Sequence, residues 1–180
     1  MKEGNKRYAE GLAAHPRQSV ARRKELTSGQ HPLAVVVACS DSRAPVELLF
    51  DCGIGDLFVI RTAGHMLDEA ALASAQYAVE HLGTRLVVVL GHTGCGAVQS
   101  VVDGAAADGH LGAALGKLDA IIPAAAARAG AGGDLAAAAV DVNVENAVAT
   151  IQSLPWASGA DVTVVGMRYD LHSGMVEEVG

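Results

Sequence analysis

"LAVVVACSDSR", residues 33–43, begins as a buried strand and ends in residues that a strand core does not hold. A nearly continuous apolar run with three adjacent valines is typical of a parallel strand covered on both faces. The run stops at Cys39, and Asp41 and Arg43 follow at alternate positions. A thiol, a carboxylate and a guanidinium therefore come together where the strand ends, which indicates a functional site.

Three further apolar runs have the same character, and segments with helical spacing lie between them. We expect strands at 33–39, 57–63, 86–91 and 161–169, an antiparallel edge strand at 175–179, and helices at 65–83, 134–154 and, broken by glycines, within 104–139. This alternation predicts an α/β fold. Its core is an open, mostly parallel sheet of four strands in the order 2-1-3-4, plus the candidate antiparallel edge strand, with helices on both faces.

The 180 residues are expected to form one domain, because no interior stretch has the composition of a linker. Residues 1–30 predict an N-terminal helical arm of two short helices that part near Pro16, and residues 31–180 predict the α/β core. Basic residues crowd the first 24 positions. We interpret them as a solvated helical face rather than a patch for lipid or nucleic acid.

Charge and hydropathy argue against nucleic acid and a membrane as partners. The net charge of −7 disfavours nucleic acid, and no apolar run approaches the roughly 18 residues of a membrane span. The first residues lack the apolar segment of a signal peptide, so we expect a cytoplasmic protein. Three cysteines in such a chain indicate a metal or a reactive thiol rather than a disulfide framework. Cys52 has no motif partner and is interpreted as a buried small hydrophobe.

Two unusual motifs are expected to meet at one edge of the sheet. The first predicted strand ends at Cys39, and the third ends at "GHTGCG", residues 91–96. Ligands in open α/β sheets bind at the carboxyl ends of such strands. Cys39, His92 and Cys95 supply two sulfurs and an imidazole, which suit Zn²⁺ and leave its fourth tetrahedral position open.

Asp41 would face the same way as Cys39, so its carboxylate could reach the metal or the metal's water. Arg43 could hold that carboxylate through a bidentate pair. Taken singly, each motif has a plainer interpretation: a packed small hydrophobe for Cys39, and a surface pair closing a turn for Asp41 and Arg43. The glycines of "GHTGCGAV" lack the Lys-Ser/Thr of a phosphate-binding loop, so we disfavour a nucleotide site.

"CSDSR" at 39–43 and "HTGC" at 92–95 together resemble the signature of the β-class carbonic anhydrases, C-x-D-x-R and H-x-x-C. "GDLFVIRTAGH" at 55–65, "QYAVEHLG" at 76–83 and "SGQHP" at 28–32 also look like segments of that family. The resemblance implies one Zn²⁺ per chain, bound by Cys39, His92 and Cys95. It makes Asp41 and Arg43 the catalytic dyad, with Asp41 on the metal only in a closed state.

The activity implied is reversible hydration of carbon dioxide to bicarbonate and a proton, by attack of zinc-bound hydroxide. The resemblance places Gln30, Phe58, Tyr77 and Gly96 at substrate-binding positions, the first three lent by a neighbouring subunit. It therefore implies a homodimer or a higher oligomer of dimers, with the N-terminal arm packed on a partner chain. Ala63 stands where that pocket often has a larger apolar residue, so the resemblance does not define the exact shape of the pocket.

Other functions stay open on the sequence. A carbonyl sulfide or carbon disulfide hydrolase would share the fold and the metal motifs, and a non-catalytic zinc module could hold a dimer together. His31 and His65 are the nearest candidates for a proton shuttle, although we favour surface or capping roles for both.

One bicarbonate-regulated group within the family has a tryptophan at the position of Val36 and commonly a valine at that of Ala44. We therefore expect an open resting site, with Asp41 paired with Arg43.

Overall fold

The computed structural model describes residues 1–158 and 161–180. Its centre is a five-stranded sheet in the order β2-β1-β3-β4-β5. The strands are β1 (Ala34–Cys39), β2 (Leu57–Thr62), β3 (Leu86–His92), β4 (Thr163–Tyr169) and β5 (Val176–Val179). The first four strands are parallel, and β5 runs antiparallel to β4. The predicted fold class and strand order are confirmed, including the edge strand.

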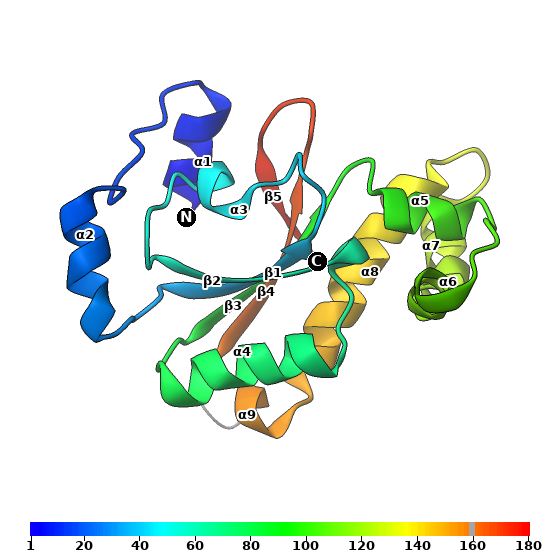
Figure 1. The fold of residues 1–180 in the computed structure, drawn as a ribbon. Helices are drawn as coiled ribbons and strands as arrows, with labels where there is room; N and C mark the ends of the chain where they lie inside the picture. Colours follow the sequence, from blue (N-terminus) through cyan, green and yellow to red (C-terminus); the bar gives the residue numbers. More distant parts are fainter. Residues whose placement is uncertain (159–160) are drawn as a thin grey trace.

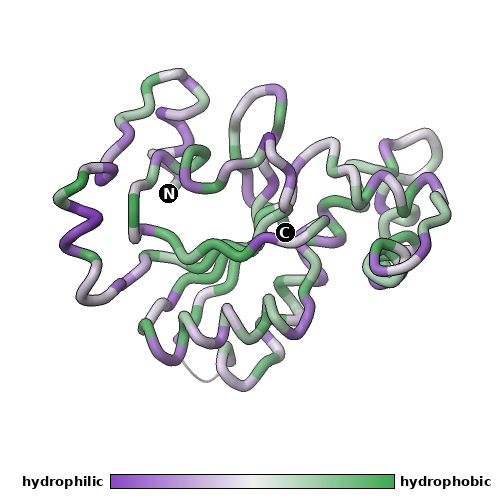
Figure 2. The backbone as a smooth tube through the Cα atoms, in the orientation of Figure 1, coloured by the Kyte–Doolittle hydropathy of each residue, from purple (hydrophilic) through white to green (hydrophobic). Residues whose placement is uncertain are grey.

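Helices cover both faces of the sheet (Figure 1). Those on one face are α4 (Glu69–His81), α8 (Leu135–Gln152) and α9 (Pro155–Ser158), and those on the other are α1 (Lys2–Ala9) and α3 (Val46–Leu49). Successive residues of β1 belong to opposite core clusters: Val35 and Val37 face α4 and α8, whereas Val36 faces α3. Figure 2 shows the apolar colour concentrated along these central strands, as double-sided burial requires.

The remaining helices lie beside the sheet rather than on it. They are α2 (Val20–Glu25), α5 (Gly96–Val102), α6 (Gly109–Leu115), α7 (Ile122–Ala129) and three 3₁₀ turns, η1 (Leu26–Ser28), η2 (Ala63–His65) and η3 (Asp119–Ile121). The helices α5, α6 and α7 pack with part of α8 in an apolar cluster that includes Cys39 and Cys95. None of the helices in residues 1–158 and 161–180 is long and apolar enough to cross a membrane.

Two glycines let α8 lie close against the sheet. A methyl group at Gly91 of β3 would come within 2.7 Å of the Val144 Cγ2 atom, and one at Gly166 of β4 within 2.7 Å of Val144 Cγ1. Val144 therefore occupies space that side chains at Gly91 and Gly166 would otherwise fill. This packing fixes the position of the α8 residues next to it, including Asn143.

The N-terminal helix docks on its own chain through a buried asparagine. Asn5 Nδ2 donates to the carbonyl oxygens of Leu49, at 3.1 Å, and Gly174, at 2.9 Å. Its Oδ1 accepts from the Val176 backbone N–H at 2.8 Å. The helix α1 is thus fastened to α3 and β5, whereas α2 buries no residue and projects from the sheet (Figure 1). The lysines of α1, Lys2 and Lys6, are exposed as well, so basic side chains of both helices face solvent, as expected of this segment.

Asp51 fastens the loop that follows α1. Its carboxylate accepts hydrogen bonds from the backbone N–H groups of Ala14 and His15, at 2.9 and 2.8 Å, and from Arg7 Nε at 2.7 Å. Asp51 is 4% exposed, and hydrogen bonding, led by the Ala14 N–H, lowers its pKa to about 2. The charge of Asp51 therefore stabilises the docked segment at neutral pH.

Asp51→Asn is expected to lower the free energy of unfolding at pH 7 by about 2 kcal/mol, because an amide cannot accept all three bonds. Asparagine tolerates the positive φ of 47° at this position, so the substitution isolates the charge. The folded-state pKa of Asp51 lies below the unfolded value of about 3.9, so its contribution is lost as pH falls from about 4 to 2. Urea titrations at both ends of that range should show a smaller difference in the free energy of unfolding between wild type and variant at the lower pH. Equal stabilities at pH 7 would refute this role.

Candidate metal centre

Three predicted ligands meet where β1 and β3 end. Cys39 is the last residue of β1 and His92 the last of β3, and these strands are paired. Cys95 follows a tight turn and caps the N-terminus of α5. The ligand atoms of these three buried residues all lie within 4.8 Å of one another, and the two sulfurs are 3.9 Å apart. The sheet thus brings together the sulfurs and imidazole that the sequence predicts as one cluster.

His92 presents an unused nitrogen to this cluster. Its Nδ1 lies 2.9 Å from the Thr93 carbonyl oxygen, so Nδ1 carries the proton and donates to that oxygen. The opposite nitrogen, Nε2, is then a free acceptor, and it is buried with no hydrogen-bond partner in the described part of the chain. Leaving such an atom unpaired costs about 1–3 kcal/mol. A zinc ion would satisfy it, and two thiolates with one imidazole nitrogen are a donor set that zinc prefers.

The two thiols of the cluster differ in acidity. Hydrogen bonding from Cys95 holds the pKa of the Cys39 thiol far below its usual range. The same contact, together with burial, raises the pKa of Cys95, although the backbone N–H groups of Val98 and Ala97 oppose this. One thiol therefore gives up its proton far more readily than the other. A cation at the cluster would favour loss of the second.

Asp41 and Arg43 form the predicted bidentate pair beside the ligands. Arg43 Nε donates to Asp41 Oδ1 at 2.9 Å, and Nη2 donates to Oδ2 at 2.6 Å. These bonds hold the pKa of Asp41 well below its usual range. Asp41 Oδ2 lies 3.8 Å from His92 Nε2. Because Arg43 Nη2 also donates to the Gly94 carbonyl at 3.1 Å, the pair is tied to the turn that carries Cys95.

Arg61 is a site residue that sequence reasoning missed. It lies near the end of β2, and its Nε donates to the Cys39 carbonyl oxygen at 2.9 Å. Its Nη2 donates to the carbonyl of Asp41. One guanidinium therefore fixes the backbone on both sides of Ser40. The only signal in the sequence was a charged residue inside an apolar strand.

The predicted substrate-binding residues fall in two places. Gly96 follows Cys95 at the start of α5, beside the ligands. The partly buried Phe58 and the 48% exposed Tyr77 instead lie next to each other, with ring centroids 6.3 Å apart. Phe58 lies four positions before Thr62 on β2, and Thr62 is the residue paired with Cys39. Four residues of an extended strand span about 13 Å.

Gln30 is exposed in the segment before β1. Because Phe58 lies that far from the residue paired with Cys39, Phe58 and its neighbour Tyr77 do not reach the ligand cluster of their own chain.

The burial of three residues outside the ligand cluster and the substrate pocket can be compared with the predictions. His65 is 1% exposed, so its interpretation as a surface or capping residue is wrong: it packs under α8 and accepts a hydrogen bond there from Asn143. His31 is exposed. Cys52 is 7% exposed, as a buried small hydrophobe should be.

Comparison with known proteins agrees with the family resemblance. A family model described as carbonic anhydrase matches residues 34–176. Carbonic anhydrase 2 of Mycobacterium tuberculosis is 52% identical over 102 residues, which are 57% of this chain and 49% of that protein. A carbonic anhydrase of Mycolicibacterium smegmatis is also 52% identical over 102 residues, 57% of this chain and 50% of its own length. The chain thus spans about half the length of the curated relatives it matches.

Solved structures share the fold over nearly the whole chain. A tetrameric β-carbonic anhydrase from Sordaria macrospora has a TM-score of 0.82 at 24% identity, covering 99% of this chain and 94% of the other. The Coccomyxa β-carbonic anhydrase in complex with acetazolamide has a TM-score of 0.78 at 26% identity, covering 98% and 83%. The fold described above is therefore that of β-carbonic anhydrases.

Proposed function

The chain belongs to the carbonic anhydrase family, and from this premise we propose that it reversibly hydrates carbon dioxide to bicarbonate and a proton. The proposal includes one zinc ion per chain, at Cys39, His92 and Cys95. The observation that carries it is the buried, unpartnered Nε2 of His92, which shares one cluster with two sulfurs. A closed structural site would use four protein ligands. Here the fourth neighbour is a carboxylate already engaged by an arginine.

The chain's own residues would orient the reactants. A zinc ion, when bound, supplies a nucleophile at neutral pH by lowering the pKa of a water molecule. Asp41 stays ionised because Arg43 donates two hydrogen bonds to it. It can therefore accept a hydrogen bond from the nucleophile and direct the remaining lone pair at the substrate carbon. Arg43 fixes the angle of that carboxylate, since it is itself held by the Gly94 carbonyl.

Substrate contacts would come from two subunits. Carbon dioxide is apolar, so the rings of Phe58 and Tyr77 from a neighbouring chain would provide an apolar wall. Gln30 of that chain and the backbone N–H of Gly96 would donate hydrogen bonds to the oxygens of bicarbonate. The exposure of Tyr77 and the position of β2 as an edge strand of the described sheet support such a neighbour. We therefore propose a homodimer or a higher oligomer of dimers as the active form.

A shared site predicts that two inactive variants restore each other. Cys95→Ser removes a ligand, and Gln30→Ala combined with Tyr77→Ala removes pocket residues. A mixed dimer has one site with intact ligands from one chain and intact pocket residues from the other. Co-expression of the two variants should recover about a quarter of the wild-type rate per chain, because half of randomly formed dimers are mixed. An active monomer in sedimentation, or no recovery in purified mixed dimers, would refute the shared site.

Parallel assays decide the substrate. The purified protein is tested by stopped flow with carbon dioxide, carbonyl sulfide and carbon disulfide at matched concentrations. We expect hydration of carbon dioxide to be faster than hydrolysis of either sulfur compound by orders of magnitude. Faster turnover of a sulfur compound would overturn the proposed substrate while leaving the metal site intact.

A further inference from the structure

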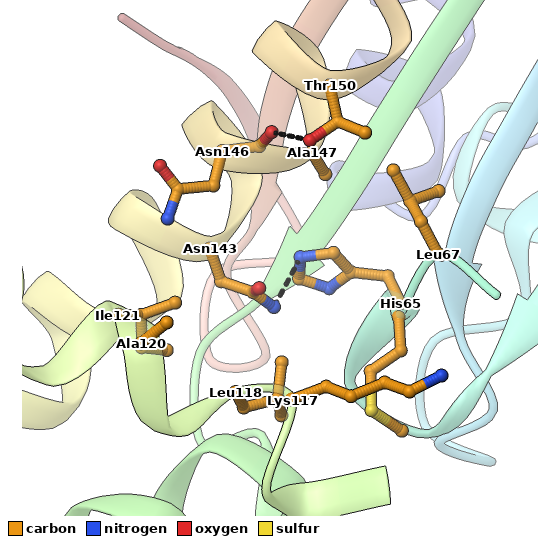
Figure 3. Close-up of a pocket in the computed structure, with 11 residues that line it drawn as sticks. His65, Leu67, Lys117, Leu118, Ala120, Ile121, Asn143, Asn146, Ala147 and Thr150 are labelled. Carbon is orange, nitrogen blue, oxygen red and sulfur yellow. Dashed lines mark hydrogen bonds between the residues drawn. The ribbon is translucent and has the colours of Figure 1, made fainter.

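One side chain of α8, that of Asn143, points toward His65 in the turn that follows β2 (Figure 3). The same turn contacts Cys39 of the ligand cluster. Asn143 Nδ2 donates to the Gly64 carbonyl oxygen and to His65 Nε2, both at 2.9 Å. The Gly64 carbonyl can only accept, so it fixes which end of the amide faces the turn. Burial lowers the pKa of His65 to about 4, so its ring is neutral at pH 7 and Nε2 can accept. Both hydrogens of the Asn143 amide are therefore used.

The same turn donates to a ligand sulfur. The backbone N–H of Gly64 donates to Cys39 Sγ at 3.3 Å. Gly64 adopts φ 62° and ψ 26°, a left-handed conformation that favours glycine. A methyl group there would also lie 3.1 Å from Ala97 Cβ and 3.2 Å from Leu118 Cδ1. The turn thus presents its N–H to the sulfur while Asn143 fastens its carbonyl.

Asn143 is itself held rigidly. It is 7% exposed, and its neighbour Val144 lies over Gly91 and Gly166 in the sheet. The position of α8 against β3 and β4 therefore determines where the amide lies. A continuous set of contacts runs from the sheet packing through Asn143 and Gly64 to Cys39.

We propose that Asn143 is a positioning residue for the metal centre, which holds the Gly64 N–H in its hydrogen bond to the Cys39 thiolate. A zinc ion bound by two thiolates receives more negative charge than one bound by histidines, and this weakens its ability to acidify water. An N–H···S bond withdraws part of that charge, and fixing the turn preorganises the ligand. The inference rests on the proposed metal at Cys39 but not on the identity of the substrate.

Cobalt(II) substitution tests this without any substrate. In Asn143→Leu, loss of the fixed N–H···S bond makes the Cys39 sulfur a stronger donor. We expect its thiolate-to-cobalt charge-transfer absorption to move to longer wavelength. Zinc affinity should fall by about tenfold, because losing the preorganised turn outweighs the stronger donation by the sulfur. The matched control is Asn146→Leu, an exposed asparagine one turn further along α8, which should change neither property.

Two further variants keep the test decisive. Asn143→Asp preserves side-chain volume but places an acceptor against the Gly64 carbonyl, so it should shift the spectrum in the same direction even if the leucine variant does not fold. His65→Leu removes the other acceptor and leaves the Gly64 contact, so its spectrum should match wild type. An unchanged spectrum in both folded Asn143 variants, or an equal shift in Asn146→Leu, would overturn the inference. A protein that shows the shift yet hydrates no carbon dioxide would refute the proposed function alone.

Discussion

Replacing Asp41 with asparagine is expected to lower the rate of carbon dioxide hydration by about a hundredfold or more while zinc stays bound. The amide has nearly the same size, but its nitrogen cannot accept the hydrogen bond that orients the nucleophile. Arg43→Ala should give a comparable loss, because Asp41 then loses both side-chain bonds that hold it. Stopped-flow rates on protein of measured zinc content provide the comparison.

A control variant separates the loss of the Asp41 hydrogen bond from the general effect of removing a negative charge. Asp119→Asn removes a carboxylate from the exposed surface at η3 and should leave the rate unchanged. The depressed pKa of Asp41 adds a second criterion. Its carboxylate stays ionised down through pH 4, so any loss of rate between pH 8 and pH 6 must come from another group. Near-wild-type hydration by Asp41→Asn would exclude Asp41 from the mechanism.

Cys95→Ser is expected to abolish both zinc binding and hydration. A serine hydroxyl does not ionise in this pH range, so the cluster would keep one thiolate and one imidazole. Elemental analysis after dialysis should find little zinc in this variant. Cys52→Ser is the matched control: Cys52 is also buried, at 7% exposure, but lies outside the cluster. Full zinc occupancy in Cys95→Ser would show that the ligand set is wrong.

The strands and the cluster of Cys39, His92 and Cys95 were predictable for one physical reason. Valine-rich runs specify parallel strands buried on both faces, and parallel strands bring their carboxyl ends to one edge. Cys39 and His92 end two such strands, so the pairing of β1 with β3 brings them together. The bidentate contact between Asp41 and Arg43 is local in sequence and followed from their spacing.

The contacts that escaped prediction join residues far apart in the chain. His65 and Asn143 are 78 positions apart, so no local pattern indicated that the histidine is buried. The predicted helix at 65–83 begins later, at Glu69, because Gly64 turns the chain and Asp68 caps the helix by accepting from the Ala71 N–H. The docking of α1 by Asn5 likewise depends on partners in α3 and before β5.

Residues assigned to a second subunit remain predictions. The partly buried Phe58 and the exposed Tyr77 lie together, at the opposite end of β2 from the residue paired with Cys39. The packing of the N-terminal arm on a partner chain is equally a property of an assembly. The complementation experiment tests the shared pocket, because it detects a site built from two chains.

Zinc titration of the metal-free protein, followed by stopped-flow carbon dioxide hydration, tests the central claim most directly. The cluster of Cys39, His92 and Cys95 predicts that the rate rises linearly with added zinc and stops rising at one zinc per chain. Zinc bound at one per chain without hydration above the buffer rate, or equal hydration by the metal-free protein, would contradict it.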